Sequence, residues 1–389
     1  MIYGLPILSL ADKAVLDLIA RQRERLRNYT YHNPRRWLGS LRRSTFARAI
    51  QGSNSIEGYH ATMDEAIAAI EDEPPQDERT ETWFAIRGYR DALTYIMQTA
   101  QDAYFELGKQ FLKSLHFMML GFDMSKQPGQ WRPAGIFIVN AKSSETVYEG
   151  PDAEMVDTLV QELIEQLKEN EKEPAIIRAA MAHLNLAMIH PFKDGNGRMA
   201  RALQTLILSR EGDLHPVFTS IEEWLGRNTG EYYDVLALAG QGRWSPRHDP
   251  LPWIKFCLKA HYQQAATLIR RNEEYEQLYN AIVAVVTRER LPERTLIPLF
   301  DAALGVTLTN ARYRTETELT DFSASRELRR LSEANLLEPK GEKRARTYSA
   351  SKRLRDMRDA VRMRIPLADP YDIIKTRAQD VQEPRLPGL

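Results

Sequence analysis

The segment His190-Pro-Phe-Lys-Asp-Gly-Asn-Gly-Arg-Met-Ala-Arg201 lies between two stretches whose apolar residues have helical spacing. The preceding stretch, Ala175–Ile189, is apolar on almost every side, which predicts a buried helix. The following stretch, residues 198–211, keeps the helical period, and Gly212 is placed to end it. The segment is therefore predicted to be a loop that leads into a helix N-terminus, where free N–H groups and the helix dipole favour an anion.

The residue types in this loop suit a ligand that carries several phosphates. Gly195 and Gly197 allow positive φ angles and a close approach of the backbone to a ligand. Consecutive amides in such a turn form a concave nest for phosphate oxygens, and Asn196 adds a side-chain donor. Arg198 and Arg201 are expected one helical turn apart on the same face. Two guanidiniums in that arrangement suit a polyphosphate.

Two further side chains in the loop supply a metal ligand and a base. Asp194 is a hard oxygen ligand of the kind that Mg²⁺ prefers when substrate phosphates complete its shell. His190 is the titratable group nearby whose ordinary pKa suits a general base near neutral pH. The structural alternative is a plain helix–loop–helix corner whose arginines pair with carboxylates. About nine specified positions match one chemical pattern, which favours the functional interpretation.

Position by position, the loop resembles the signature of Fic-domain (Fic/Doc) proteins, His-Pro-Phe-x-Asp/Glu-Gly-Asn-Gly-Arg-x-x-Arg. The resemblance implies a mainly α-helical core with a β-hairpin flap. It also implies an enzyme that transfers AMP from ATP to a Ser, Thr or Tyr hydroxyl of a protein, with His190 as the base and Asp194 holding Mg²⁺. Phe192 would anchor the loop in the core. The implied ATP-binding residues are Gly195, Asn196, Gly197, Arg198, Met199, Ala200 and Arg201, with Tyr232 and Tyr233 as candidates to stack on the base. Tyr233 is the favoured one of the two.

A second string, Ser53-Asn-Ser-Ile-Glu57-Gly58, follows a predicted helix over residues 38–51 that is expected to end at Gly52. Locally the string predicts one helical turn that Ser53 caps and Gly58 ends. It also resembles the inhibitory helix of the same family, Ser/Thr-x-x-x-Glu-Gly/Asn. Glu57 would pair with Arg201 and repel the terminal phosphate, so that ATP binds with its α-phosphorus misaligned.

This string predicts a self-inhibited enzyme. In some members of the family the corresponding glutamate also helps water to remove AMP from the target. A reverse, de-AMPylating role for Glu57 is therefore an open alternative.

Two β-rich runs, residues 135–140 and 146–149, surround a polar turn at residues 141–145 and predict a hairpin. By sequence alone, a small structural flap is the simpler interpretation. The family resemblance implies a flap that covers the active site and receives a target segment by strand addition.

The composition changes after about residue 280. Helices are predicted near residues 293–304, 312–319 and 323–335, followed by a two-stranded wing over 336–349, which together resemble a winged-helix domain. Residues 321–364 contain 13 Lys and Arg against 7 Asp and Glu, an excess of six that permits DNA contact through the third helix. The predicted domains are an N-terminal helical region (1–95), a Fic core (96–278), the winged-helix-like domain (280–352) and a tail (353–389), which is expected to be poorly ordered after Arg364.

The bulk composition limits the class of protein. The 389 residues carry 53 basic and 53 acidic side chains, so net charge does not direct the chain to nucleic acid or membranes. The single Cys257 excludes an internal disulfide and a cysteine-based zinc site. No apolar run approaches the ~20 residues of a membrane helix, and a cytoplasmic location is expected.

The expected partners are ATP and an unidentified protein substrate, with the enzyme itself as a further target. Two other interpretations are open. One is a Fic-fold transferase of another phosphate-linked group, comparable to a kinase. The other is a DNA-binding regulator whose Fic core is inactive.

Overall fold

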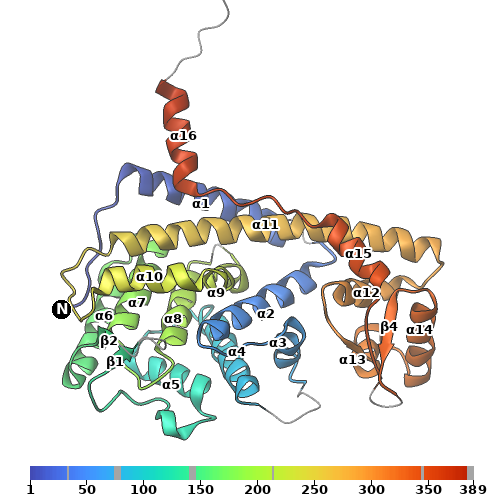
Figure 1. Cartoon of the computed structure of the whole chain (residues 1–389), viewed down its shortest axis with the longest axis horizontal. Helices are drawn as coiled ribbons and strands as arrows, with labels where there is room; N and C mark the ends of the chain where they lie inside the picture. The colour runs from blue at the N-terminus through green and yellow to red at the C-terminus, as the bar shows by residue number, and fades with distance from the viewer. Residues whose placement is uncertain (33–34, 74–79, 140–145, 213, 343–345, 383–389) are drawn as a thin grey trace, which may run out of the picture.

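The computed structural model describes residues 1–32, 35–73, 80–139, 146–212, 214–342 and 346–382, and it is mainly helical (Figure 1). The N-terminal region contains α1 (Leu10–Arg27), α2 (Leu38–Ile56), α3 (Met63–Ile70) and α4 (Glu81–Thr99). Ser9 caps α1 and Thr62 caps α3, each in a capping box with the acidic residue three positions later. These caps supply acceptors for N–H groups that a helix start leaves unpaired.

The next segment forms the helical layer that holds the signature loop. Its elements are α5 (Lys109–Leu120), β1 (Phe137–Val139), β2 (Thr146–Glu149), α6 (Val156–Glu169), α7 (Ala175–Ile189), α8 (Asn196–Arg210), α9 (Glu222–Arg227) and α10 (Thr229–Gly240). The buried helix predicted at Ala175–Ile189 is confirmed, since nearly all its side chains are buried. Helices α7 and α8 pack against each other, with the loop at their junction.

The predicted hairpin is confirmed for its strands. β1 and β2 pair antiparallel, with Ile138 opposite Tyr148. The turn predicted at residues 141–145 lies outside the described residues. Tyr148 donates a hydrogen bond from its hydroxyl to the carbonyl of Met188, 2.9 Å away, near the end of α7. This bond fixes the base of the hairpin beside the loop.

A long helix, α11 (Leu251–Arg288), runs along the molecule and joins its two parts (Figure 1). The sequence predicted a boundary of the Fic core at residue 278, which lies inside this helix. The helix continues because residues 279–288 keep apolar side chains, including Ile282 and Val286, in the buried face. One rigid element therefore crosses the predicted domain boundary.

The C-terminal part combines short helices with a small antiparallel sheet. It contains α12 (Leu296–Ala303), β3 (Leu308–Thr309), α13 (Asn310–Thr317), α14 (Asp321–Glu333), β4 (Leu337–Lys340), β5 (Thr347–Ala350) and α15 (Lys352–Val361). The strands form an antiparallel sheet in the order β3-β5-β4. The predicted helices and wing are confirmed, and the short strand β3 adds to them.

The predicted disordered tail is wrong over its described part. Residues of α16 (Pro370–Gln382) form a helix whose start contacts α1 and α11 and whose remainder projects from the molecule (Figure 1). Tyr371 donates its hydroxyl hydrogen to Asp12 Oδ1 across 2.8 Å. An apolar and hydrogen-bonded contact with a distant helix therefore orders a segment whose local composition is polar and proline-rich.

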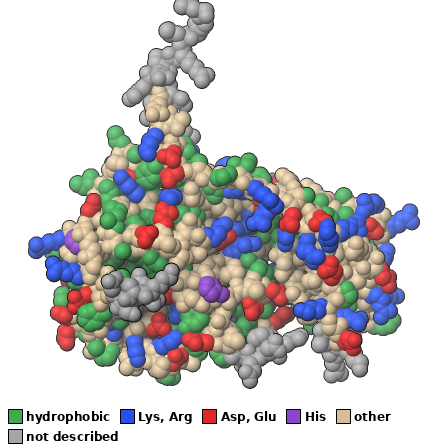
Figure 2. Space-filling model, in the orientation of Figure 1, with side chains coloured by type: hydrophobic (Ala, Val, Ile, Leu, Met, Phe, Trp, Pro, Cys, Tyr) green, Lys and Arg blue, Asp and Glu red, His purple; other side chains and the backbone are tan. Residues whose placement is uncertain are grey.

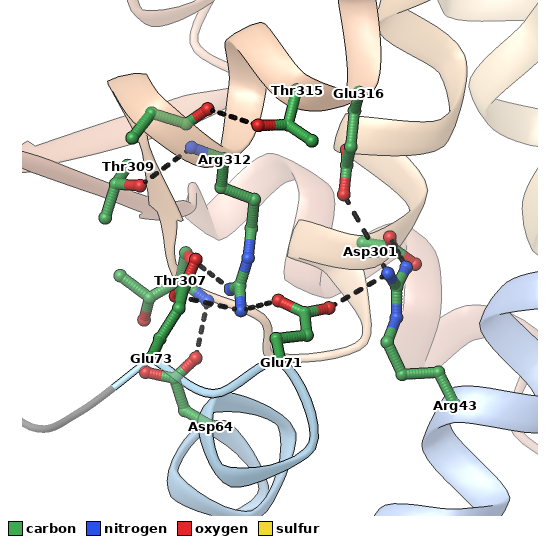
Figure 3. Close-up of polar contacts among 11 residues, drawn as sticks. Arg43, Asp64, Glu71, Glu73, Asp301, Thr307, Thr309, Arg312, Thr315 and Glu316 are labelled. Carbon is green, nitrogen blue, oxygen red and sulfur yellow. Dashed lines mark hydrogen bonds and ion pairs between the residues drawn. The ribbon is translucent and has the colours of Figure 1, made fainter.

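The C-terminal domain is joined to α2 and α3 by a polar cluster (Figure 3). Arg43 of α2 lies between Glu71, 3.1 Å away, and the buried carboxylate of Asp301 on α12. Arg312 of α13 contacts the same Glu71 and also Glu73 at 3.2 Å. Because charged side chains from both parts share partners, the domain is held in a defined position against α2.

Helix α2 differs from its prediction at its C-terminal end. The sequence predicted a stop at Gly52, yet the helix continues to Ile56. Gly52 instead allows α2 to touch α9, since a Cβ at this position would lie 2.4 Å from the backbone oxygen of Glu222. Ser53 is consequently inside the helix and does not cap it. Among the described residues, no helix is long and apolar enough to cross a membrane.

Candidate active site

Two residues with positive φ angles bound the signature loop. His190 ends α7 at φ +51°, and Gly195 precedes α8 at φ +75°. Phe192 is fully buried between them, and its ring is stacked on His116 of α5 at a centroid distance of 3.7 Å. The predicted anchoring of the loop by Phe192 agrees with this position. The turn therefore holds the start of α8, where helix N–H groups are free, in the position predicted to bind an anion.

The ring of His190 is held as a neutral base. Its Nδ1 lies 3.2 Å from the carbonyl oxygen of Ala187, and a carbonyl can only accept, so Nδ1 carries the hydrogen. The lone pair is consequently on Nε2. Burial is the main cause that lowers the pKa of His190 to about 4, with the charge of Arg132 acting in the same direction. The side chain is thus unprotonated at neutral pH, as a general base must be.

Arg132, which precedes the hairpin, fixes the backbone around this histidine. Its side chain is 4% exposed, and its Nε donates to the carbonyl of His190 at 2.8 Å. The guanidinium also donates to the carbonyls of Ala134, at 2.6 Å, and Pro151. Its backbone N–H donates to Pro191 across 2.9 Å. One side chain therefore ties both ends of the hairpin to the signature loop.

We expect Arg132→Lys to lower the unfolding free energy by about 2–3 kcal/mol, because an ammonium cannot reach carbonyls that a planar guanidinium satisfies together. The catalytic rate should fall more than the KM for ATP rises, since the base moves while the phosphate site remains. Urea unfolding and steady-state kinetics measure the two effects. Arg247→Lys, an exposed arginine, is the control and should change neither quantity. An unchanged unfolding midpoint in Arg132→Lys would contradict this role.

The side chain of Asn196 is used inside the loop. Its Oδ1 accepts from the backbone N–H of Phe192 at 2.9 Å, and its Nδ2 donates to the Phe192 carbonyl at the same distance. These bonds occupy Oδ1 and one hydrogen of Nδ2, and phosphate binding by the Asn196 side chain stays a prediction. His116 closes the other side of the loop by donating from Nε2 to the Asp194 carbonyl, 2.9 Å away.

Asp194 fits a site in which ATP would supply most of the metal ligands. Its carboxylate is partly exposed, and one oxygen accepts from the Gly195 N–H at 2.6 Å. Burial acts to raise the pKa of Asp194, but the charges of Arg198 and Lys126 and the Gly195 hydrogen bond lower it overall. Among the described residues, no group of three or more His, Cys, Asp or Glu gathers to hold a metal. A single carboxylate with phosphate oxygens is a typical Mg²⁺ arrangement.

Lys126 contacts the second oxygen of Asp194, with Nζ 3.2 Å from Oδ2. The same ammonium lies 3.0 Å from the Tyr59 hydroxyl and 3.2 Å from Glu81. A cation bound with ATP would compete with this ammonium for Asp194. Lys126 thus links the predicted metal ligand to the residue that follows the inhibitory string.

The two signature arginines lie in different surroundings. Arg201 is 1% exposed, and its Nε and Nη2 donate to the Oγ and backbone oxygen of Ser53 at 2.7 and 3.0 Å. Arg198 is equally buried, lies over the ring of Tyr59, and has Nε and Nη1 without a hydrogen-bond partner in the described part of the chain. Buried guanidinium nitrogens that lack partners are suited to bind an incoming anion.

The predicted ion pair between Glu57 and Arg201 is present. Glu57 Oε1 lies 2.6 Å from Arg201 Nη2, and the carboxylate is 22% exposed. A Cβ at Gly197 would lie 2.5 Å from the same carboxylate oxygen, so the glycine makes room for Glu57 over the start of α8. Gly58 ends the string at φ +85°. A carboxylate therefore lies where a phosphate of a bound nucleotide is predicted.

The tyrosine pair is divided between core and surface. Tyr232 is buried, its hydroxyl is 3.0 Å from His183 Nε2, and Trp253 and Phe256 pack around it. Tyr233 is 47% exposed and donates to the Ile56 carbonyl at 3.2 Å. Tyr233 is therefore the member of the pair with a ring face that a base can reach. Met199 and Ala200 are both fully buried, and the Met199 N–H donates to the Gly195 carbonyl at 3.0 Å, so contact of either residue with ATP stays a prediction.

Sequence reasoning did not identify Arg132, His116 or Lys126 as parts of the site. Each contributes through contacts with residues 58 to 78 positions away, which local spacing cannot reveal. The sequence contained a partial signal for Arg132. This arginine precedes the predicted hairpin, and loops near it contain backbone carbonyls that need hydrogen-bond donors.

Comparison with known proteins gives a consistent result for this site. The Fic/DOC family model matches residues 106–208, which include α5, the hairpin, α7 and most of α8. The chain is 27% identical to a protein named protein adenylyltransferase Fic from Nematostella vectensis, over 65% of this chain and 55% of that protein. It is 26% identical to protein adenylyltransferase fic-1 from Caenorhabditis briggsae, over 65% and 46%. The chain thus spans about half the length of these relatives.

Solved structures show the same fold. A Fic family protein from Desulfovibrio desulfuricans superposes with a TM-score of 0.58 at 22% identity, over 90% of this chain and 99% of that one. Fic-1 from C. elegans superposes with a TM-score of 0.52 at 22% identity, over 66% and 72%. The signature loop, the family match and the shared fold agree, and residues 106–208 are the part of the chain that matches the Fic/DOC family.

Proposed function

We propose that the chain is a protein adenylyltransferase that moves AMP from ATP to a Ser, Thr or Tyr hydroxyl and is inhibited by Glu57. The observation that carries the proposal is the buried Arg201 paired with Glu57 at the start of α8, beside a neutral His190. The names of the two relatives support the same chemistry. A cytoplasmic location stays a prediction.

In the proposed step, Nε2 of His190 takes the proton of the target hydroxyl while the hydroxyl oxygen attacks the α-phosphorus of ATP. The bond between the α-phosphorus and the oxygen that bridges to the β-phosphate breaks, and pyrophosphate leaves. The free N–H groups at the start of α8 and the guanidiniums of Arg198 and Arg201 stabilise the negative charge on the phosphates. Mg²⁺, held by Asp194, would neutralise phosphate charge during the transfer.

The resting state follows from the same contacts. Because Arg201 Nη2 already binds Glu57, the guanidinium cannot fully bind a terminal phosphate, and the carboxylate repels that phosphate. ATP that binds beside Glu57 would therefore place its α-phosphorus away from His190. A de-AMPylating role of Glu57, in which it positions water, also stays a prediction.

The hairpin offers a place for the target segment. Among the described strands, β1 pairs with β2 alone, so its other edge has free backbone groups. Phe137 on this strand is largely exposed. An extended peptide could add to this edge and bring a hydroxyl toward His190. The exposed apolar surface of β1 is small, which suits weak binding of a substrate that must leave after the reaction.

The position of the label in ATP tests the reaction. Full-length protein carrying Glu57→Gly, Mg²⁺ and lysate proteins are incubated with ATP labelled at the α- or the γ-phosphate. We expect protein-bound label from α-labelled ATP only, since the α–β bond breaks. Label from γ-labelled ATP would instead establish the kinase-like alternative. Label from neither, with ATP binding intact, would contradict transfer and would favour the DNA-binding interpretation, for which α14 presents the exposed Arg326 and Arg329.

A further inference from the structure

A cavity of about 420 Å³ lies between α2, α9, α11 and the segment that follows α15. Six arginines line it: Arg48, Arg227, Arg270, Arg271, Arg358 and Arg362. Two carboxylates, Glu223 and Glu274, also line it, which leaves an excess of four positive charges. Figure 2 shows Lys and Arg side chains gathered over the middle of the molecule, where the C-terminal segment crosses α11.

The two carboxylates are already engaged. Glu223 Oε1 accepts from Arg271 at 2.5 Å and from Arg227 at 3.1 Å. Glu274 Oε1 accepts from the backbone N–H of Met363 at 2.8 Å. The two carboxylates offset two of the six guanidinium charges, so an excess of four positive charges remains in the cavity.

Two arginines in the cavity keep nitrogens without partners. Arg271 is only 7% exposed, and its Nη1 has no hydrogen-bond partner in the described part of the chain. The Nε of Arg48 also has no hydrogen-bond partner among the described residues. Burial, and next the charge of Arg271, lower the pKa of Arg48, which shows that like charges are crowded here. Leaving such groups unpaired is costly unless a ligand satisfies them.

We propose that this cavity binds a small molecule that carries two or more phosphates, separate from the ATP of the active site. Guanidiniums bind phosphate oxygens in pairs, and six of them around one cavity suit a polyphosphate group. Tyr275, Leu278 and Met363 give the cavity an apolar wall beside the arginines, which suits a nucleoside attached to the phosphates. A volume of about 420 Å³ fits a small ligand and not a nucleic-acid duplex.

The cavity is mechanically connected to the inhibitory contact. Arg48 is on α2, less than three helical turns before Glu57, and Glu223 is on α9. Helices α2 and α9 touch backbone to backbone at Gly52 and Gly226, so a shift of one moves the other. A ligand that draws Arg48 toward Arg358 of the C-terminal domain would therefore shift the helix that carries Ser53 and Glu57. This regulatory consequence rests on the proposed function, whereas the binding itself does not.

Calorimetric titration of the full chain without Mg²⁺ tests the binding, with inorganic tripolyphosphate and ADP as probes. We expect Arg48→Gln and Arg362→Gln each to raise the Kd at least tenfold, and Arg355→Gln, on α15 outside the cavity, to leave it unchanged. Arg198→Gln, in the active site, should retain this binding. ADP binding tenfold more tightly than tripolyphosphate would identify a nucleotide ligand, and equal affinity would identify a phosphate chain alone. Binding lost only in Arg198→Gln, or absent at about 5 mM probe, would overturn the proposal.

Thermal unfolding without ligand separates a binding role from a structural one. Because Arg48 is crowded by Arg271 and has an unpaired nitrogen, Arg48→Gln should raise the Tm by about 2–4 °C while it weakens binding. A lower Tm in Arg48→Gln together with unchanged binding in the rim variant Arg362→Gln would show a structural arginine and contradict the site. Neither the calorimetric titration nor the thermal unfolding depends on adenylyl transfer. Both therefore remain informative if the protein transfers no AMP.

Discussion

Replacing Glu57 by glycine is expected to raise the rate of AMP transfer about 30-fold or more. The carboxylate forms a charge-assisted hydrogen bond of 2.6 Å with a guanidinium that is almost fully buried. Such a bond contributes roughly 2 kcal/mol, and each 1.4 kcal/mol corresponds to a factor of ten. The variant frees Arg201 Nη2 for phosphate and removes a negative charge from the start of α8. Initial rates with α-labelled ATP and lysate proteins measure the effect.

Graded variants distinguish the ion pair from a general loosening of α2. Glu57→Gln keeps the size and an acceptor oxygen, so it should raise the rate less than Glu57→Gly does. Ser53→Ala removes only the partner of Arg201 Nε and should have a smaller effect again. Glu57→Gly should also lower the Tm without ATP and increase the stabilisation by ATP, because the buried guanidinium loses one partner and gains another. Equal rates in wild type and Glu57→Gly would refute inhibition by this residue.

The sequence predicts most of the site because the site is built from short-range patterns. Helices α7 and α8 follow from apolar periodicity, and the loop between them follows from two glycines and its neighbours. The Glu57–Arg201 pair connects residues 144 positions apart, yet each member belongs to a recognisable local string. A short motif does not show which distant residues its side chains contact. Ser53 was therefore expected to cap a turn, whereas its side chain accepts a hydrogen bond from Arg201.

The remaining differences come from tertiary packing that overrides local preference. By local sequence, Gly52 predicts the end of a helix. In the structure α2 continues past Gly52, because the contact between α2 and α9 requires a residue without a side chain at this position. Tyr232 and Tyr233 are adjacent in sequence, and only their burial separates a core residue from one that can meet a base. Arg132 donates hydrogen bonds to carbonyls of three segments, and these carbonyls come close to one another only when the chain has folded.

Replacing His190 by alanine is expected to lower the transfer rate by about 10³-fold, in the range that a general base contributes. The test uses Glu57→Gly as the starting enzyme, so that the loss is measured from an active form. ATP binding should remain, because the start of α8 and both signature arginines are unchanged. His60→Ala, an exposed histidine near the inhibitory string, is the control and should keep the full rate. Equal loss in both variants, or loss of ATP binding in His190→Ala, would point to damage of the fold.

The pH profile of the active form tests the state of the same base. Burial lowers the pKa of His190 from 6.5 to about 4, so the imidazole is unprotonated and able to accept a proton throughout the range from about pH 6 to 8. The rate should therefore change little over this range and fall only as the pH drops below about 5. Since an exposed histidine would lose activity near pH 6.5, a midpoint at that value would show that the pKa of His190 is not lowered by its surroundings. The hydrogen bond from Nδ1 to Ala187 directs the basic lone pair to Nε2, and this geometry makes a pKa of about 4 compatible with catalysis at neutral pH.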